Sequence, residues 1–452
     1  MKRPDVHAAA GERRGRRIAV VGSGIAGNAC AFALAARHDV VLYEREPRPG
    51  GHSATATIDY DGTPVDVDTG FIVYNERNYP NLTALLAAIG VVTEASDMSF
   101  SVSADGGRRE WSGDGLRGLF AQRSNLASPG FHGMLADIMR FNRLAPRDRA
   151  SGALAGLSLG DYLARRRYGR RFVDDYLVPM GAAIWSTPAA RMLAFPAECL
   201  VAFFENHRLM HLGRPVWRTV SGGSRRYVER LVGPLAGGLR LSTPVARIER
   251  QAGGVVVVDA RGHRDSFDEV VVAAHSDQAL AMLVDPSEDE RAVLGAIGYR
   301  PNRVVLHRDP ALMPKRPAAW ASWNYLSSGS GGDRAVSVTY WMNRLQNLDR
   351  RRPLFVSLNP IAAPRPDSVF GSYLYDHPQF DAAALAAQRR LGAIQGARRI
   401  WFCGAWCGNG FHEDGLVAGL AVAEALGGAV PWRPLRPSPG DAAGATLREA
   451  AE

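Results

Sequence analysis

Three glycines near the start of the chain have the spacing that lets backbone approach a phosphate. Gly22, Gly24 and Gly27 follow the mostly β-branched run Ile18–Val21 in the pattern G-x-G-x-x-G. Gly22 permits a tight turn, Gly24 leaves room for a diphosphate, and Gly27 lets the following helix pack closely on the strand. The N-terminus of that helix directs N–H groups and partial positive charge at the phosphates. We therefore expect this segment to bind a dinucleotide.

An acidic residue follows the glycines at a spacing typical of a ribose contact. Glu44 ends the run Asp39–Tyr43 and comes 17 positions after Gly27, close to the usual distance of about 20. Its carboxylate is suited to ribose hydroxyls and would repel a 2′-phosphate. The residues therefore predict a cofactor with an unphosphorylated ribose, such as NAD or FAD.

The same stretch has an alternative interpretation as an export signal. The arginines within residues 13–17 form a basic region, and residues 33–35 resemble a cleavage site. A leader that is removed has no use for the glycine spacing or for Glu44, so we favour the nucleotide-binding interpretation.

Charge and length limit the classes of function. The chain has 452 residues and a net charge of +9, enough length for two domains with substantial cores. No uninterrupted apolar run reaches membrane-spanning length. The basic charge favours anionic lipid or an acidic substrate, with ordinary solvated charge as the alternative. Nucleic acid is not an expected partner, because no recognition motif accompanies the charge.

Hydrophobic patterning divides the chain into two kinds of segment. Strand and helix patterns of an α/β nucleotide-binding domain occupy residues 16–75, 216–285 and 398–428. The later expected strands there are 239–241, 245–249, 255–258, 270–273 and 399–403, followed by a helix over 415–426. Residues 76–215 and 286–397 are assigned to a mixed α+β substrate domain. It is mostly helical over 76–212 and has antiparallel strands at 303–307, 335–341 and 354–358. Residues 1–15 and 431–452 are expected to be flexible.

Five motifs in order give the chain a resemblance to the flavin amine oxidase and phytoene desaturase superfamily. They are GSGIAG at 22–27 with Glu44, E-x-x-x-R-x-G-G over Glu44–Gly51, Asp68–Gly70, Ser242–Ile248, and Phe402–Gly404 with Gly410–Gly415. The resemblance implies FAD rather than NAD. It also implies an α/β fold in which a Rossmann-like FAD-binding domain of the glutathione reductase type is interrupted by a substrate domain.

The resemblance also implies which residues contact the FAD. They are Gly22, Gly24, Ile25, Ala26, Gly27, Glu44, Arg45, Arg48, Gly50, Gly51, His52, Thr69, Gly70, Val245, Gly404, Glu413, Gly415 and Leu416. In that superfamily the glycine pair lies near the pyrophosphate, the D-x-G segment lies near the isoalloxazine, and the backbone at Val245 pairs with adenine.

Two side chains are candidates for catalysis, His412 and Tyr74. Hydride transfer to flavin N5 leaves negative charge over N1 and the C2 carbonyl, which calls for a positive end there. The helix expected near Gly415 supplies it through its N-terminal N–H groups. His412, just before that start, is a candidate donor, with capping or packing as the alternative. Further candidates for lining the substrate, or for the core, are Asn75, Tyr340, Trp341 and Asn343.

Departures from the superfamily pattern bear on the reaction. His52 stands where arginine usually follows the glycine pair, and Ala405 replaces the glutamate usual after Gly404. The amine-oxidising branch places a lysine beside flavin N5, and the candidate here, Lys315, lies in an expected loop. This disfavours classical amine oxidation.

A narrower resemblance is to a bacterial subgroup of predicted NAD/FAD-binding proteins. It rests on segments such as SGGSRRYVERL and GFHEDGL, and members often accompany cyclopropane-fatty-acid-synthase-like methyltransferases. The subgroup implies an acyl-chain substrate and a lipid methyltransferase as a partner. We therefore expect an FAD-dependent oxidoreductase that removes hydride from a C–H bond of a fatty-acyl or other lipid substrate. The alternatives are an amine or amino-acid oxidase and a non-catalytic flavin-bound partner of a lipid-modifying enzyme.

Three further expectations follow. No second dinucleotide fingerprint occurs, so electrons should pass to oxygen, a quinone or a carrier protein, with net isomerisation as the alternative. We expect a cytoplasmic protein, and peripheral contact with the inner membrane is considered for the amphipathic segment 130–141, although a helix packed in the substrate domain is favoured. His207 and His211 are spaced like metal ligands but lack a third partner, so no metal site is expected.

Overall fold

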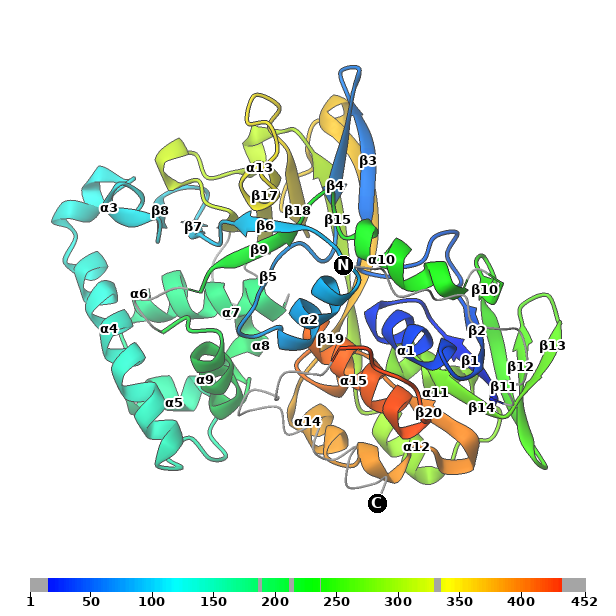
Figure 1. The fold of residues 1–452 in the computed structure, drawn as a ribbon. Helices are drawn as coiled ribbons and strands as arrows, with labels where there is room; N and C mark the ends of the chain where they lie inside the picture. Colours follow the sequence, from blue (N-terminus) through cyan, green and yellow to red (C-terminus); the bar gives the residue numbers. More distant parts are fainter. Residues whose placement is uncertain (1–14, 186–188, 211–214, 236, 329–334, 433–452) are drawn as a thin grey trace.

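The computed structural model describes residues 15–185, 189–210, 215–235, 237–328 and 335–432, and Figure 1 shows their arrangement. Residues 1–14 of the predicted N-terminal arm, residues 433–452 of the predicted tail, and His211 lie outside the described residues.

A parallel five-stranded sheet forms the nucleotide-binding core. Its order is β10 (Leu239–Arg240), β2 (Asp39–Tyr43), β1 (Arg17–Val21), β14 (Glu269–Val272) and β20 (Ile400–Phe402). Ile18, Val20 and Val271 are fully buried, as expected for a parallel sheet covered on both faces. Strands from all three predicted nucleotide-binding stretches lie side by side here, which confirms the Rossmann-like α/β fold.

Helices and an antiparallel meander accompany this sheet. The helices are α1 (Ile25–Ala35), α10 (Arg225–Val232), α11 (Ser276–Met282), α12 (Glu288–Leu294), α14 (Ala382–Gln388) and α15 (His412–Ala425). The meander is β11 (Val245–Gln251), β12 (Gly254–Asp259) and β13 (Arg264–Phe267). Helices α1 and α15 pack against each other (Figure 1). A Cβ on Gly419 of α15 would lie 2.2 Å from the Ala26 carbonyl oxygen, so this close packing needs glycine there.

A second, seven-stranded sheet comes from the predicted substrate-domain segments. Its order is β19 (Val369–Gln379), β15 (Gly298–His307), β18 (Phe355–Leu358), β17 (Ala335–Trp341), β16 (Trp323–Ser328), β7 (Phe100–Ala104) and β8 (Arg109–Ser112). The strand expected at 335–341 is present with these ends, and those expected at 303–307 and 354–358 are present with shifted starts. The exact domain boundaries stay a prediction.

The sequence interpretation missed four strands of this sheet, namely β7, β8, β16 and β19. Two of them lie in the stretch expected to be mostly helical. Strand β7 carries buried Ser101 and Ser103, and it pairs in parallel with β16 across more than two hundred residues. Phe100, Val102 and Ala104 alternate with serines along β7, a strand signal that the sequence interpretation did not use, whereas the pairing with distant β16 leaves no local signal.

The remaining elements complete the molecule. They are the hairpin β3 (Thr55–Tyr60) and β4 (Thr63–Asp68), the small sheet of β5 (Tyr74–Asn75), β9 (Trp217–Val220) and β6 (Thr93–Ser96), α2 (Pro80–Ala88) and α13 (Met342–Leu345). The helices at the left of Figure 1 are α3 (Gly115–Leu119), α4 (Pro129–Ala150), α5 (Leu159–Arg165), α6 (Arg170–Phe172), α7 (Val178–Trp185), α8 (Ala189–Leu193) and α9 (Ala197–Asn206). Among the described residues, no helix combines the length and apolar character needed to cross a membrane.

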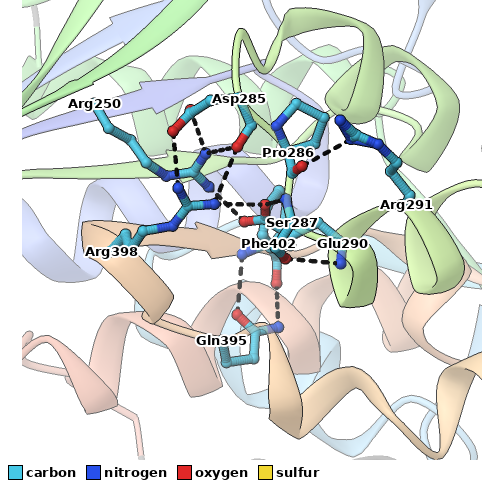
Figure 2. A network of polar contacts seen from close by, with 9 residues as sticks. All are labelled: Arg250, Asp285, Pro286, Ser287, Glu290, Arg291, Gln395, Arg398 and Phe402. Atoms are coloured by element: carbon cyan, nitrogen blue, oxygen red, sulfur yellow. Dashed lines mark hydrogen bonds and ion pairs between the residues drawn. The ribbon is translucent and has the colours of Figure 1, made fainter.

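A buried ion-pair network joins separate parts of the nucleotide-binding core (Figure 2). Glu290, 1% exposed on α12, accepts hydrogen bonds from Arg250 of β11 and is 3.4 Å from Arg398, which precedes β20. Asp285 also pairs with both arginines, at 2.7 and 2.8 Å. The network thus ties the meander to the C-terminal segment of the chain.

Replacing Glu290 by alanine should lower the free energy of unfolding by about 3 kcal/mol, because Arg250 would lose one of two carboxylates that balance its buried charge. Chemical denaturation of the purified protein measures this. The matched control is Asp289→Ala on the same helix, whose pair with Arg390 is about half exposed and should contribute less than about 1 kcal/mol. Equal losses for the two variants would contradict the assignment.

Candidate cofactor and active site

The two glycine motifs of the N-terminal region lie against each other. A Cβ on Gly51 would come within 3.1 Å of the Gly24 Cα, and the Gly50 N–H donates to the Ser23 carbonyl at 2.9 Å. A Cβ on Gly27 would lie 1.9 Å from the Gly22 carbonyl oxygen, so α1 packs on the loop as predicted. A Cβ on Gly24, by contrast, would meet no protein atom within 4 Å. The side of the loop expected to face a diphosphate is therefore open.

The predicted ribose ligand stands at the edge of this loop. Glu44 follows the last residue of β2 and is 8% exposed. Its carboxylate accepts hydrogen bonds from the Ser23 N–H and from the Glu46 N–H, each at 2.9 Å. The Thr243 N–H donates to the Glu44 carbonyl at 2.8 Å, which brings Val245, the first residue of β11, to the same end of the sheet.

Three predicted motifs meet at His52. A Cβ on Gly70 would lie 2.1 Å from the His52 carbonyl oxygen, and this oxygen accepts a hydrogen bond from the Phe71 N–H at 2.8 Å. The Phe71 ring stacks on His412 at 3.8 Å and 9°. The G-G-H segment, the D-x-G segment and the start of α15 therefore converge, although they are far apart in the sequence.

His412 lies at the start of α15 and takes part in a chain of hydrogen bonds. The helix begins at His412, three residues earlier than predicted, so His412 lies in the first turn rather than before it. Its Nε2 is hydrogen-bonded to the Tyr227 hydroxyl at 2.6 Å, and that hydroxyl is bonded to Ser53. Burial lowers the pKa of His412 to about 3. The ring is therefore neutral near pH 7 and is not a cationic proton donor.

Three more histidines surround the same place and are also neutral. Burial lowers the pKa of His52 well below its usual value, and His377, His275 and His412 lower it further. Burial lowers the pKa of His377 to about 4, and that of His275 is also lowered by burial. Nε2 of His52 and Nδ1 of His275 are buried and have no hydrogen-bond partner among the described residues. Four neutral rings thus gather here, and two of them present unused polar atoms.

Two carboxylates next to this cluster, those of Glu413 and Asp68, are occupied. Glu413 accepts hydrogen bonds from the N–H and side-chain amide of Asn81, both at 2.8 Å, and from the Leu82 N–H at 3.0 Å. It therefore caps α2, and contact between Glu413 and the cofactor stays a prediction. Burial raises its pKa to about 7. Asp68 is bound by Thr55, Ser224 and Gln346.

The other predicted residues fall into two groups. Those in the interior of the converging segments are Ile25, Ala26, Thr69, Tyr74, Gly404, Gly415 and Leu416. Thr69 shares a hydrogen bond of 2.8 Å with the Tyr375 hydroxyl, and Tyr74 is 2% exposed. Arg45 and Arg48 are exposed, and Arg48 donates to the Gly51 carbonyl at 3.1 Å. Cofactor contact by any of these residues stays a prediction.

Several candidates have other partners. Asn343 binds the backbone of Asp349, Arg352 and Leu354, so it fixes a loop. Nδ1 of His207 lies 3.0 Å from the Phe203 carbonyl, and its ring stacks on the Phe203 ring. In the part of the chain that the structure describes, no three His, Cys, Asp or Glu residues gather as metal ligands.

Sequence reasoning missed several residues of this cluster. They are Ser53, Phe71, Tyr227, His275, Tyr375 and His377. A signal existed for His275, which follows the carboxyl end of the parallel strand β14, where ligands usually bind. Tyr375 and His377 lie on β19, which was not predicted, and nothing local distinguishes them.

Comparison with known proteins identifies the family. Residues 25–344 match the sequence model described as flavin containing amine oxidoreductase. The chain belongs to this family. Its cofactor is FAD, and the protein is an FAD-dependent oxidoreductase. The geometry fits this cofactor, because the loop at Gly24 is open and the nearby His52 Nε2 lacks a partner.

Individual relatives share parts of the sequence or the whole fold. Carotenoid phi-ring synthase from Streptomyces griseus is 36% identical over 172 residues, which cover 33% of this chain and 31% of that relative. Cyclohexylamine oxidase from Brevibacterium oxydans superposes with a TM-score of 0.66 at 14% identity, covering 91% of this chain and 98% of that one. The fatty acid isomerase from P. acnes gives 0.61 at 15% identity, with 92% and 99% covered. At such identities the two structures show the shared fold.

Gly24→Val should weaken FAD binding about tenfold or more without destabilising the FAD-free protein, because the new side chain enters space meant for the diphosphate. Titration of stripped protein with FAD and thermal unfolding without FAD test the two halves of this statement. Gly27→Ala is the contrasting variant, since its Cβ would collide with the Gly22 carbonyl and should impair folding itself. Full FAD affinity in Gly24→Val would contradict the assignment.

The free energy of unfolding should fall as pH is lowered below about 6.5. In the unfolded chain His412 binds a proton near pH 6.5, whereas in the folded protein its pKa is about 3 and it stays neutral. Between pH 7.5 and 5 this residue should account for a loss of about 1–2 kcal/mol. His412→Gln should therefore show a shallower pH dependence of unfolding. The control His263→Gln, at a side chain 73% exposed, should retain the full dependence. An unchanged slope in His412→Gln would show that its protonation is not coupled to folding.

Proposed function

We propose that this protein removes hydride from a C–H bond of an apolar substrate, a fatty-acyl or other lipid chain. The observation that carries the proposal is the ring-rich lining at the converging motifs, which contains four neutral histidines. His52, His275, His377 and His412 are neutral near pH 7. An apolar chain can enter such a lining without leaving a protein charge unpaired.

FAD supplies the hydride acceptor for this reaction. Loss of the hydride and of a proton from the neighbouring carbon turns a C–C single bond into a double bond, and two electrons leave with the hydride. They pass on to oxygen, a quinone or a carrier protein. The first N–H groups of α15, which begins at His412, have no carbonyl partner within the helix. They would favour negative charge that develops on the ring system of FAD bound there.

The hydrogen-bonded series Ser53, Tyr227 and His412 has a positioning role in this proposal. Burial raises the pKa of Tyr227 and lowers that of His412, so the series holds its protons and stays neutral. A neutral, hydrogen-bonded His412 stacked on Phe71 keeps a fixed orientation. It can present a donor without adding a charge that an apolar substrate would have to bury.

Two observations argue against an amine substrate. Glu413 and Asp68, two carboxylates next to the cluster, already accept hydrogen bonds from protein groups and are not free to hold an ammonium. Lys315 packs at the turn between β7 and β8, where a Cβ on Gly107 would lie 2.7 Å from its Cδ. This turn belongs to the far edge of the seven-stranded sheet, so Lys315 does not take the place of the lysine of the amine-oxidising branch.

The relatives support both substrate classes to different degrees. The phi-ring synthase has a carotenoid in its name, and a fatty acid isomerase shares the fold. This chain matches only 31% of the length of the synthase, so a carotenoid or acyl substrate stays a proposal. Cyclohexylamine oxidase shares the fold as well, which keeps amine oxidation as the second candidate. A lipid methyltransferase partner is retained only as a prediction.

Anaerobic mixing tests the substrate class. The purified FAD-loaded protein should lose the absorbance of oxidised flavin with carotenoids or long-chain fatty acids, and the product should be two hydrogens lighter by mass spectrometry. Putrescine and cyclohexylamine should leave the flavin oxidised. Bleaching by an amine, with no change on lipids, would overturn the proposal. A lipid product of unchanged mass would replace dehydrogenation by isomerisation.

A further inference from the structure

The positive charge of the chain is concentrated in one segment. Residues 115–171 contain eleven arginines and three aspartates, a net charge of +8, whereas the whole chain has +9. This segment forms α3, a short 3₁₀ helix at Arg123–Ala127, α4, α5 and the start of α6. Most of these elements lie at the left of the molecule in Figure 1, on the side away from β10 and β2.

The long helix α4 has two opposite faces. Its buried residues are Phe131, Met134, Phe141, Ala145 and Asp148. Its exposed residues include His132, Ala136, Met139, Arg143, Arg147 and Ala150, which recur every three or four positions. The apolar stripe packs in the core, as favoured from the sequence, so it cannot contact a membrane. The opposite, basic stripe faces solvent.

Large apolar side chains accompany these arginines on the surface. Met139 is 68% exposed on α4, and Leu116 and Leu126 are 74% and 59% exposed just before it. The segments that carry them are joined, because Nε2 of His132 lies 2.9 Å from the Leu126 carbonyl and its ring lies 6.5 Å from that of Phe120.

Acidic side chains balance part of this charge, because they pair with Arg140, Arg149, Arg166, Arg170 and Arg171. Asp148 is 6% exposed and is bound by Tyr162 and Arg166. Asp137 is held by Arg140 at 3.0 Å and by the Gly169 N–H at 2.7 Å. Within the described residues, no ion pair involves Arg143 or Arg147. Their charges therefore remain available to a partner.

We propose that the outward face of α4, together with Leu116 and Leu126, binds the surface of an anionic lipid bilayer. Arginines attract anionic headgroups, and exposed leucine and methionine side chains gain free energy by entering the boundary between headgroups and acyl chains. A nucleic acid would use the arginines but leave the apolar side chains in water. This inference concerns a surface remote from the flavin cluster and does not depend on the proposed substrate.

Vesicle flotation with the FAD-loaded protein tests the surface. It should bind vesicles of phosphatidylcholine mixed equally with phosphatidylglycerol, and bind vesicles of phosphatidylcholine alone much less. Reversal of the two outward charges, Arg143→Glu with Arg147→Glu, should weaken binding about tenfold or more. Met139→Gln should weaken binding even in high salt, where electrostatic attraction is screened.

A matched control separates this face from net charge. Arg226→Glu with Arg230→Glu makes the same charge change at the same spacing on exposed positions of α10, and it should leave vesicle binding nearly unchanged. An equal loss in both double variants would overturn the proposal. Binding to a DNA duplex that survives Met139→Gln, with no binding to anionic vesicles, would favour nucleic acid instead. Flavin content and anaerobic reduction are measured separately, so a failure here leaves the proposed function standing.

Discussion

The site depends on close contacts between main-chain segments that only glycine permits. Gly24 meets Gly51, Gly27 meets Gly22, and Gly70 meets the carbonyl of His52. At Gly27 and Gly70 a single methyl group would collide with main chain, and at Gly51 it would fit tightly against the Gly24 Cα, whereas at Gly24 it would project into open space. The same tight packing therefore brings three motifs together and leaves one surface of the loop free for the diphosphate.

Burial then sets the electrostatic character of the cluster. Histidine is ordinarily divided between two charge states near pH 7, but desolvation holds His52, His275, His377 and His412 in the neutral form. The carboxylates of Glu413 and Asp68 accept hydrogen bonds from other groups of the protein. Charge is instead placed at the surface, most strongly on α4 and its neighbours, where water and an anionic partner can balance it.

Long-range polar ties are needed because the nucleotide-binding core is assembled from separate pieces of chain. The network around Glu290 joins the meander to the C-terminal segment, and Trp406 donates to the Ala274 carbonyl at 3.0 Å across the end of β14. Glu413 joins α15 to α2 in the same way. These contacts keep the start of α15 against the glycine loops.

Local spacing and periodicity in the sequence were enough to predict the parallel core, the glycine loops and the amphipathic helix over residues 130–141, and the family resemblance added the FAD cofactor. Contacts between distant segments bring Tyr227 and Ser53 to His412, direct Glu413 to α2 and join β7 to β16, and the sequence did not reveal them. Those outcomes depend on which distant segments become neighbours, and on how burial shifts a pKa once they do. Neither the contact partner nor the pKa shift can be inferred from the sequence of one contacting segment alone.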